Sequence, residues 1–198
     1  MMRGRPIVFA ASLACALAAN AQAPSPTPAA PSPESAAFEF SEVVPVEGAM
    51  KDQLYSAGLA WFGDAFRSAK AVLDVQDKDA GRLVGKPSFA YTPKVFVGSA
   101  RIKGAMRYTV TVEVKEGKYR YTIDGFTHNR TPGPGGAPSS FGLLTTAAKC
   151  PYPVEGPTAG GRQETWEHLK ALSKAEAETL IASLKKRMPD AGKKGKDW

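Results

Sequence analysis

The chain has 198 residues, of which 43% are hydrophobic, and a formal net charge of +7. Its length and hydrophobic content suit one globular domain with additional segments. The positive charge lies mainly at the two ends: Arg3 and Arg5 supply +2 and residues 185–198 supply +4, which leaves about +1 for everything between. A nucleic-acid-binding protein concentrates basic residues on its folded surface, so we expect no nucleic-acid partner.

The first 23 residues have the pattern of a secretory signal peptide. Two arginines precede a short apolar run at residues 7–19, which is too short to span a bilayer, and Ala21-Gln22-Ala23 forms an A-x-A cleavage site. We predict cleavage after Ala23 and an exported protein, periplasmic or secreted, with no transmembrane span. Two alternatives stay open: a lipoprotein anchored at Cys15 and a buried N-terminal helix.

Residues 24–37 form a linker rich in proline, alanine and serine. Such a segment buries little surface and favours polyproline II, so we expect a spacer and place a single domain at residues 38–189. The first predicted strand covers residues 38–46. It contains Pro45, which cannot donate to a sheet and therefore favours an edge position or the end of the strand.

The next predicted element is an amphipathic helix over residues 50–69. Apolar and small residues recur there at spacings of three and four, which forms one broad apolar stripe: Leu54, Gly58, Trp61, Phe62, Ala65, Phe66 and Ala69. Trp61 has two interpretations, a core anchor against the sheet and an exposed residue that stacks on a ligand. We favour the core anchor.

Two short strands, residues 71–76 and 82–86, are predicted on either side of an acidic turn. The carboxylates of this region invite a calcium interpretation, but an EF-hand loop that starts at Asp77 places Ser88 where a bidentate glutamate is required. We therefore predict a solvated hairpin turn and no metal. A further strand is predicted over residues 89–97.

Residues 106–126 form the segment around which the domain is organised. Apolar and polar side chains alternate along both halves, and Gly117 lies in a tight turn between them, which is the pattern of a half-buried antiparallel hairpin. The apolar face needs the cover of helices, while the polar face stays exposed. The candidate partner-binding surface is a set of five residues on this polar face: Arg107, Thr109, Thr111, Arg120 and Thr122.

Residues 127–161 are rich in glycine and proline and are predicted to form a long irregular loop, either functional or mobile. The last helix is predicted to start at Ser173, which forms a capping box with Glu176, and to end before Pro189. The basic tail, residues 190–198, is predicted to be disordered. It has two interpretations: weak contact with an anionic surface such as membrane headgroups, and a role in solubility alone.

The predicted order is strand, helix, several antiparallel strands and helix. Both helices are amphipathic, so each needs one apolar partner surface. We therefore predict an α+β fold of two layers, with one antiparallel sheet of about five strands and two helices on one face.

Three stretches carry a resemblance to a known family: Leu54-Tyr55 with Trp61, the run DKDAGRLVG at residues 77–85, and the run VKEGKYRY at residues 114–121. They resemble the exported bacterial proteins of domain of unknown function 4468, which have a TATA-binding-protein-like fold. The resemblance covers roughly residues 38–126 and implies the fold and export. The family has no assigned activity, so the resemblance supplies no catalytic residues, and residues 127–161 depart from its pattern as an insertion would.

The sequence contains no H-E-x-x-H zinc motif, no Cys-x-x-Cys pair and no phosphate-binding glycine loop. After signal cleavage Cys150 is the only cysteine, so an intrachain disulfide is excluded and an intermolecular one stays open. We predict a non-catalytic binding or assembly module of the cell envelope, with no cofactor and with an unidentified protein or envelope component as partner. The alternative is a hydrolase that uses Cys150 with His128 or His168.

Overall fold

The computed structural model describes residues 36–66, 68–94, 99–131, 140–154 and 157–191. The predicted signal peptide, with Cys15, and all but the last two residues of the predicted linker lie outside these ranges. Residues 192–198 of the predicted tail lie outside them too, so its contact with an anionic surface stays a prediction. None of the helices in the described ranges has the length and apolarity needed to cross a bilayer.

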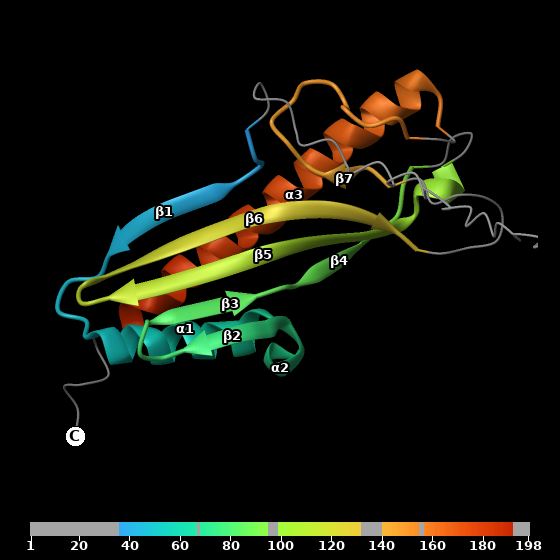
Figure 1. The fold of residues 1–198 in the computed structure, drawn as a ribbon. Coiled ribbons are helices and arrows are strands. Elements are labelled where there is room, and N and C mark those ends of the chain that lie inside the picture. The colour runs from blue at the N-terminus through green and yellow to red at the C-terminus, as the bar shows by residue number, and fades with distance from the viewer. Residues whose placement is uncertain (1–35, 67, 95–98, 132–139, 155–156, 192–198) are drawn as a thin grey trace, which may run out of the picture. The chain divides into compact units, whose positions relative to one another are not determined.

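The described residues form one antiparallel sheet of seven strands (Figure 1). Five strands follow the order β1-β6-β5-β3-β2, while β4 pairs with the first part of β5 and β7 pairs with the later part of β6. The bounds are β1 Phe40–Pro45, β2 Leu73–Asp77, β3 Arg82–Gly85, β4 Ser88–Tyr91, β5 Gly104–Lys115, β6 Lys118–Arg130 and β7 Gly142–Leu143.

Two long helices, α1 (Lys51–Ala65) and α3 (Ala159–Arg187), cover one face of this sheet (Figure 1). The remaining helices are short: α2 (Ala69–Val72) beside α1, and the 3-10 helices η1 (Ser99–Ile102) and η2 (Met188–Ala191). The predicted two-layer α+β fold is confirmed. The sheet has seven strands rather than about five because β4 and β7 are short segments that pair alongside β5 and β6.

The predicted central hairpin is confirmed as β5 and β6, which pair from Gly104 with Arg130 to Lys115 with Lys118. Gly117 closes the turn with a φ of 70°, a conformation that glycine adopts without steric cost. Side chains on alternate positions of both strands are buried under the helices: Tyr108, Val110, Val112, Val114, Tyr119, Tyr121 and Ile123. This alternation gives the sheet one apolar face and one polar face.

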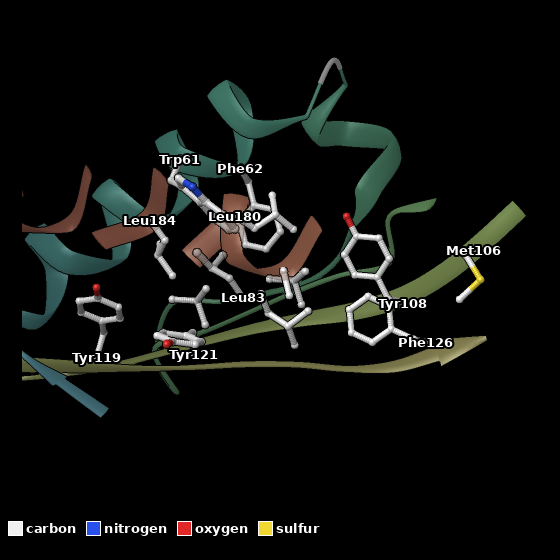
Figure 2. Packing of buried hydrophobic residues seen from close by; sticks show 14 of the residues in the cluster. Trp61, Phe62, Leu83, Met106, Tyr108, Tyr119, Tyr121, Phe126, Leu180 and Leu184 are labelled. Atoms are coloured by element: carbon white, nitrogen blue, oxygen red, sulfur yellow. The ribbon is translucent and has the colours of Figure 1, made fainter. Parts of the chain in front are cut away.

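Helix α1 approaches the sheet closely because glycine faces it from the strand below. A Cβ atom on Gly85 of β3 would lie 2.5 Å from Cε1 of Phe62, so any side chain there would force the Phe62 ring out of its position. Figure 2 shows the side chains of Trp61, Phe62, Leu83 and Leu180 gathered between the helices and the sheet. The hydrophobic core cluster of the described residues therefore includes the side chains packed between the helices and the sheet.

Trp61 is a core residue, as predicted. Its side chain is 1% exposed, and its ring packs edge-on against Phe62 and Phe66 with centroid separations of 4.9 and 5.9 Å. Its indole Nε1 donates a hydrogen bond of 2.8 Å to Oγ of Ser183 on α3. Trp61 thus joins the two helices, and the interpretation as an exposed stacking residue is wrong.

Two tyrosines of the hairpin fix α3 over the sheet through carboxylates. Tyr108 donates a hydrogen bond of 2.7 Å to Glu176, and Tyr121 donates one of 2.7 Å to Glu42 of β1. Nζ of Lys185 on α3 donates a hydrogen bond of 2.6 Å to the same Glu42 oxygen. Burial raises the pKa of both tyrosines and the adjacent carboxylates raise it further, so both stay protonated donors.

Several predicted boundaries move. Helix α1 ends at Ala65 rather than residue 69, because Phe66 takes an extended conformation, and β2 starts at Leu73 because residues 69–72 form a helical turn. Residues 127–161 are not one irregular loop: β6 continues to Arg130, β7 follows, and α3 begins at Ala159. The domain also reaches beyond residue 189, because Ala191 is 7% exposed.

The predicted helix start at Ser173 is wrong. Helix α3 is capped fifteen residues earlier by Thr158, whose Oγ1 accepts a hydrogen bond of 3.2 Å from the amide of Gly161. Ser173 lies in the middle of α3, fully buried, and its hydroxyl has no hydrogen-bond partner within the described residues. Glu176 bonds Tyr108 across the layers instead of closing a capping box.

We expect Trp61→Ala to lower the free energy of unfolding by about 3–5 kcal/mol, because it removes a fully buried indole and leaves a cavity between α1, α3 and the sheet. Urea denaturation measures this value. Met50→Ala is the control, because Met50 is 58% exposed and its truncation should cost less than about 0.5 kcal/mol. Equal costs for the two variants would contradict the packing described here.

Thr158→Ala should destabilise the protein by about 1 kcal/mol through loss of the helix cap. Ser173→Ala should instead stabilise it by about 1 kcal/mol, because it removes a buried hydroxyl that has no partner while keeping the volume nearly unchanged. Chemical denaturation of both variants tests the pair. If Ser173→Ala lowers the stability instead, the Ser173 hydroxyl must form a hydrogen bond in the folded protein.

Candidate functional site

The five predicted partner-binding residues lie on the sheet face opposite α1 and α3, against which none of the described helices packs, and we call it the open face. Along β5 the buried positions alternate with Arg107, Thr109 and Thr111, and along β6 with Arg120 and Thr122. The two arginines are exposed, and the three threonines are half-buried by neighbouring side chains of the sheet. The five residues thus share one face of the sheet, and their role in binding a partner stays a prediction.

An uncharged row crosses the open face through five strands. Strand pairing places Val75 of β2 beside Val84 of β3, Val84 beside Thr111, Thr111 beside Thr122, and Thr122 beside Ser41 of β1. Val75 is 40% exposed, and Ser41 Oγ lies 3.1 Å from Thr122 Oγ1. This row in the middle of the open face is therefore free of formal charge and consists of valine and hydroxyl side chains, of which Val84 is only 7% exposed.

A charged row lies next to the uncharged row, towards the hairpin turn. Its members alternate in sign across four strands: Asp77 pairs with Arg82, Arg82 with Glu113, and Glu113 with Arg120. Nε of Arg120 donates a hydrogen bond of 2.8 Å to Oε2 of Glu113. The Asp77 carboxylate accepts a hydrogen bond of 2.8 Å from the amide of Ala80. Val43 of β1 continues this row and is 55% exposed.

On the other side of the uncharged row the open face turns acidic. Thr109 pairs with Asp124, and Glu39 lies close to the Asp124 carboxylate. Burial raises the pKa of Asp124, and the negative charge of Glu39 raises it further. Arg107 lies one step beyond, opposite Thr127 and Ser88. Charge thus borders the uncharged row on both sides.

Sequence reasoning found only the part of this surface that lies on the hairpin. It missed the members contributed by other strands, which are Ser41, Val43, Val75, Asp77, Arg82 and Val84. The alternation of polar and apolar residues within each strand carries a signal for the face on which a residue lies. No local sequence pattern encodes the register between strands that are far apart in sequence. The rows are therefore visible only in the folded sheet.

A groove of about 660 Å³ lies between α1 and η2. Its floor contains the small side chains of Ser56, Ala57 and Ala60. Its charged walls are paired: Lys78 lies 3.2 Å from Asp52, and Arg187 lies 3.7 Å from Asp64 at the continuation of the groove. The groove therefore presents little uncompensated charge to a ligand.

The residues of the hydrolase alternative do not form a nucleophile–base pair. His128 is fully buried, and its Nδ1 accepts a hydrogen bond of 3.1 Å from the amide of Phe141. Nε2 must then carry the proton and donate to the Ile102 carbonyl at 3.0 Å, so both ring nitrogens are engaged with the backbone. Burial lowers the pKa of His128 to about 4, and the ring is neutral.

Cys150 lies in a different environment. Its thiol contacts the Tyr152 carbonyl at 3.7 Å, and burial raises its pKa, which keeps it protonated and weakly nucleophilic. His168 contacts Tyr91, with ring centroids 5.9 Å apart. The Cys150 thiol thus bonds a backbone carbonyl, and the Cys150 amide donates a hydrogen bond of 3.3 Å to Oε1 of Gln163.

The carboxylates considered for calcium serve the β2–β3 hairpin. Asp74 lies 2.7 Å from Lys86, and Asp77 accepts from the amide of Ala80 in the turn. Within the described part of the chain, no group of three or more histidine, cysteine, aspartate or glutamate side chains is arranged to hold a metal ion.

We expect the stability of the protein to fall as pH decreases from about 6.5 to about 4. The folded state keeps His128 neutral down to about pH 4, whereas the unfolded chain binds a proton on this histidine near pH 6.5. The stability that the neutral His128 gives the folded state is therefore fully present above pH 6.5 and is lost as pH falls from 6.5 to 4. The full loss is about 3 kcal/mol. Urea denaturation at several pH values measures it, and His128→Gln should flatten the dependence; an unchanged dependence would contradict the assignment.

Comparison with known proteins agrees with this geometry. A family model described as a domain of unknown function (DUF4468) with TBP-like fold matches residues 40–129. The chain is similar to a TBP-like protein from Parabacteroides distasonis ATCC 8503, with 13% identity, a TM-score of 0.52 and coverage of 78% of this chain and 92% of that one. It is also similar to a DUF4468 family protein from Bacteroides ovatus ATCC 8483, with 11% identity, a TM-score of 0.45 and coverage of 74% and 85%. None of the curated proteins compared matches the chain.

The first of these structures shows the fold alone, because its identity to this chain is low. The family model covers the strands that build the open face, from Phe40 at the start of β1 to Asn129 in β6, together with α1 on the opposite side of the sheet. Residues 40–129 of the chain thus match the model of DUF4468, a family of unknown function with a TBP-like fold.

Proposed function

We propose that this protein is an exported, non-catalytic binding or assembly module of the cell envelope, and that a protein partner docks on its open face. The export part of the proposal comes from the sequence, in which a signal-peptide pattern precedes a proline-rich spacer. The binding part comes from the uneven cover of the sheet, because both long helices pack on one side.

The uncharged row carries this proposal. Protein interfaces place few charges at their centre and surround it with a polar rim. The open face has the same arrangement: an uncharged row that includes Val75, Thr111 and Thr122, with the charged row on one side and Asp124 with Glu39 on the other. Val43 and Val75 add exposed apolar surface to a face that is otherwise polar.

The hydrolase alternative gains no support from the described geometry. A nucleophilic cysteine needs a lowered pKa and a base within hydrogen-bond reach. Burial raises the pKa of Cys150, and the ring nitrogens of His128 are both occupied by backbone groups.

Thr111→Arg should abolish partner binding and leave the fold intact. The change puts a long charged side chain in the middle of the uncharged row, on a face that supports no helix. The measurement is affinity capture of the protein from its native envelope, with the captured proteins identified by mass spectrometry. Ala182→Arg on the exposed side of α3 is the matched control and should keep the captured proteins. Melting temperatures within a few degrees of the parent confirm that both variants fold.

If the Thr111→Arg variant captures the same proteins as the parent, the open face is not the binding surface. If only the Ala182→Arg variant loses the captured proteins, the binding surface lies on the helix layer instead.

A further inference from the structure

We propose that the partner on the open face is a second copy of this chain, packed sheet to sheet about a two-fold axis that runs parallel to the strands between β3 and β5. The inference rests on the proposed function of the open face and names its occupant. The order of charges in the charged row carries it.

The charged row has four positions on adjacent strands, with the signs minus, plus, minus and plus for Asp77, Arg82, Glu113 and Arg120. Neighbouring strands lie about 4.8 Å apart, so the row extends about 14 Å. Its midpoint falls between Arg82 and Glu113, on β3 and β5. Reversing the row about this midpoint exchanges every sign.

A two-fold axis parallel to the strands performs this reversal in a face-to-face pair. It places Arg82 of one copy opposite Glu113 of the other, and Asp77 opposite Arg120, each contact occurring twice as an isologous interface requires. A two-fold axis that runs across the strands along the charged row would instead place each residue opposite its own kind. The signs therefore select one of the two ways in which a pair of these sheets can stack.

The same axis packs the uncharged row against itself. Val84 of one copy then faces Thr111 of the other, and Val75 faces Thr122. Packed sheets lie about 10 Å apart, which arginine and glutamate side chains span together. Since sheets twist by about 20–25° per strand, the contact is closest near the axis, at β3 and β5.

Charge pairing within one copy does not account for the whole arrangement. The Arg120–Glu113 pair is exposed, with side-chain exposures of 55% and 34%, and such pairs contribute little to stability. Val75 is also exposed on this face, and the proposed dimer covers it with Thr122 of the second copy. Complementary charge across an interface fixes orientation and disfavours other partners.

The test mixes two variants with complementary changes. In Arg82→Glu the new carboxylate faces Glu113 of the second copy, and in Glu113→Arg the new guanidinium faces Arg82, so each variant alone repels its own copy twice. In an equimolar mixture every position of the charged row again faces the opposite sign. Sedimentation velocity over a concentration series measures self-association of the parent, each variant and the mixture.

We expect the parent to dimerise reversibly, each variant alone to dimerise at least about tenfold more weakly, and the mixture to recover the parent's association. Lys70→Glu on α2, in the helix layer, is the matched control and should dimerise like the parent. If either inner variant fails to fold, Asp77→Arg and Arg120→Glu form the equivalent outer pair. A parent that stays monomeric up to about 1 mM, or a mixture that associates no better than its components, overturns the inference.

The two proposals fail in different ways. A monomeric parent whose captured proteins are lost in Thr111→Arg would refute the second copy and keep the open face as a binding surface. A dimer that forms equally in Thr111→Arg and in the complementary variants would refute the open face as the interface.

Discussion

The structure depends on the one-sided burial of the β5–β6 hairpin. Alternate side chains of both strands, from Tyr108 to Ile123, are sealed beneath α1 and α3. Apolar burial supplies most of the stabilising free energy of such a domain, and only one sheet face takes part. The positions of both helices, the close approach at Gly85 and the exposure of the opposite face all follow from this layer.

Hydrogen bonds from aromatic side chains fix the helices on that layer. Tyr108 bonds Glu176 of α3, Tyr121 bonds Glu42, and Trp61 bonds Ser183 between the two helices. Apolar contacts have little directional preference, whereas a buried donor must meet its acceptor. These bonds therefore set the position of α3 along the sheet, and the N-terminal half of α3 is held in turn by the bond of Trp166 Nε1 to the Ala147 carbonyl at 3.0 Å.

The open face is the remaining consequence of this arrangement. A sheet with helices on one side leaves the other to water or to a partner, and here its charges are ordered by strand register rather than scattered. The groove beside α1 is a hollow of ordinary ligand size, but its charges are paired within the chain. The alternating charges of the open face constrain a binding partner more than the groove does, because they favour one orientation of that partner over the others.

The sequence alone determined the elements with strong periodicity: the hairpin, with its period of two, and the stripe of α1 that contains Trp61. It also determined which hairpin residues share the polar face, because side chains in a strand alternate strictly. It misplaced the start of α3 at Ser173, because the local Ser-x-x-Glu pattern of a capping box also fits the interior of a long helix whose serine is buried and whose glutamate bonds Tyr108. Only the tertiary structure decided the rows of the open face, since they join β1, β2, β3, β5 and β6 through pairing between residues as distant as Ser41 and Thr122, and no local pattern encodes that register.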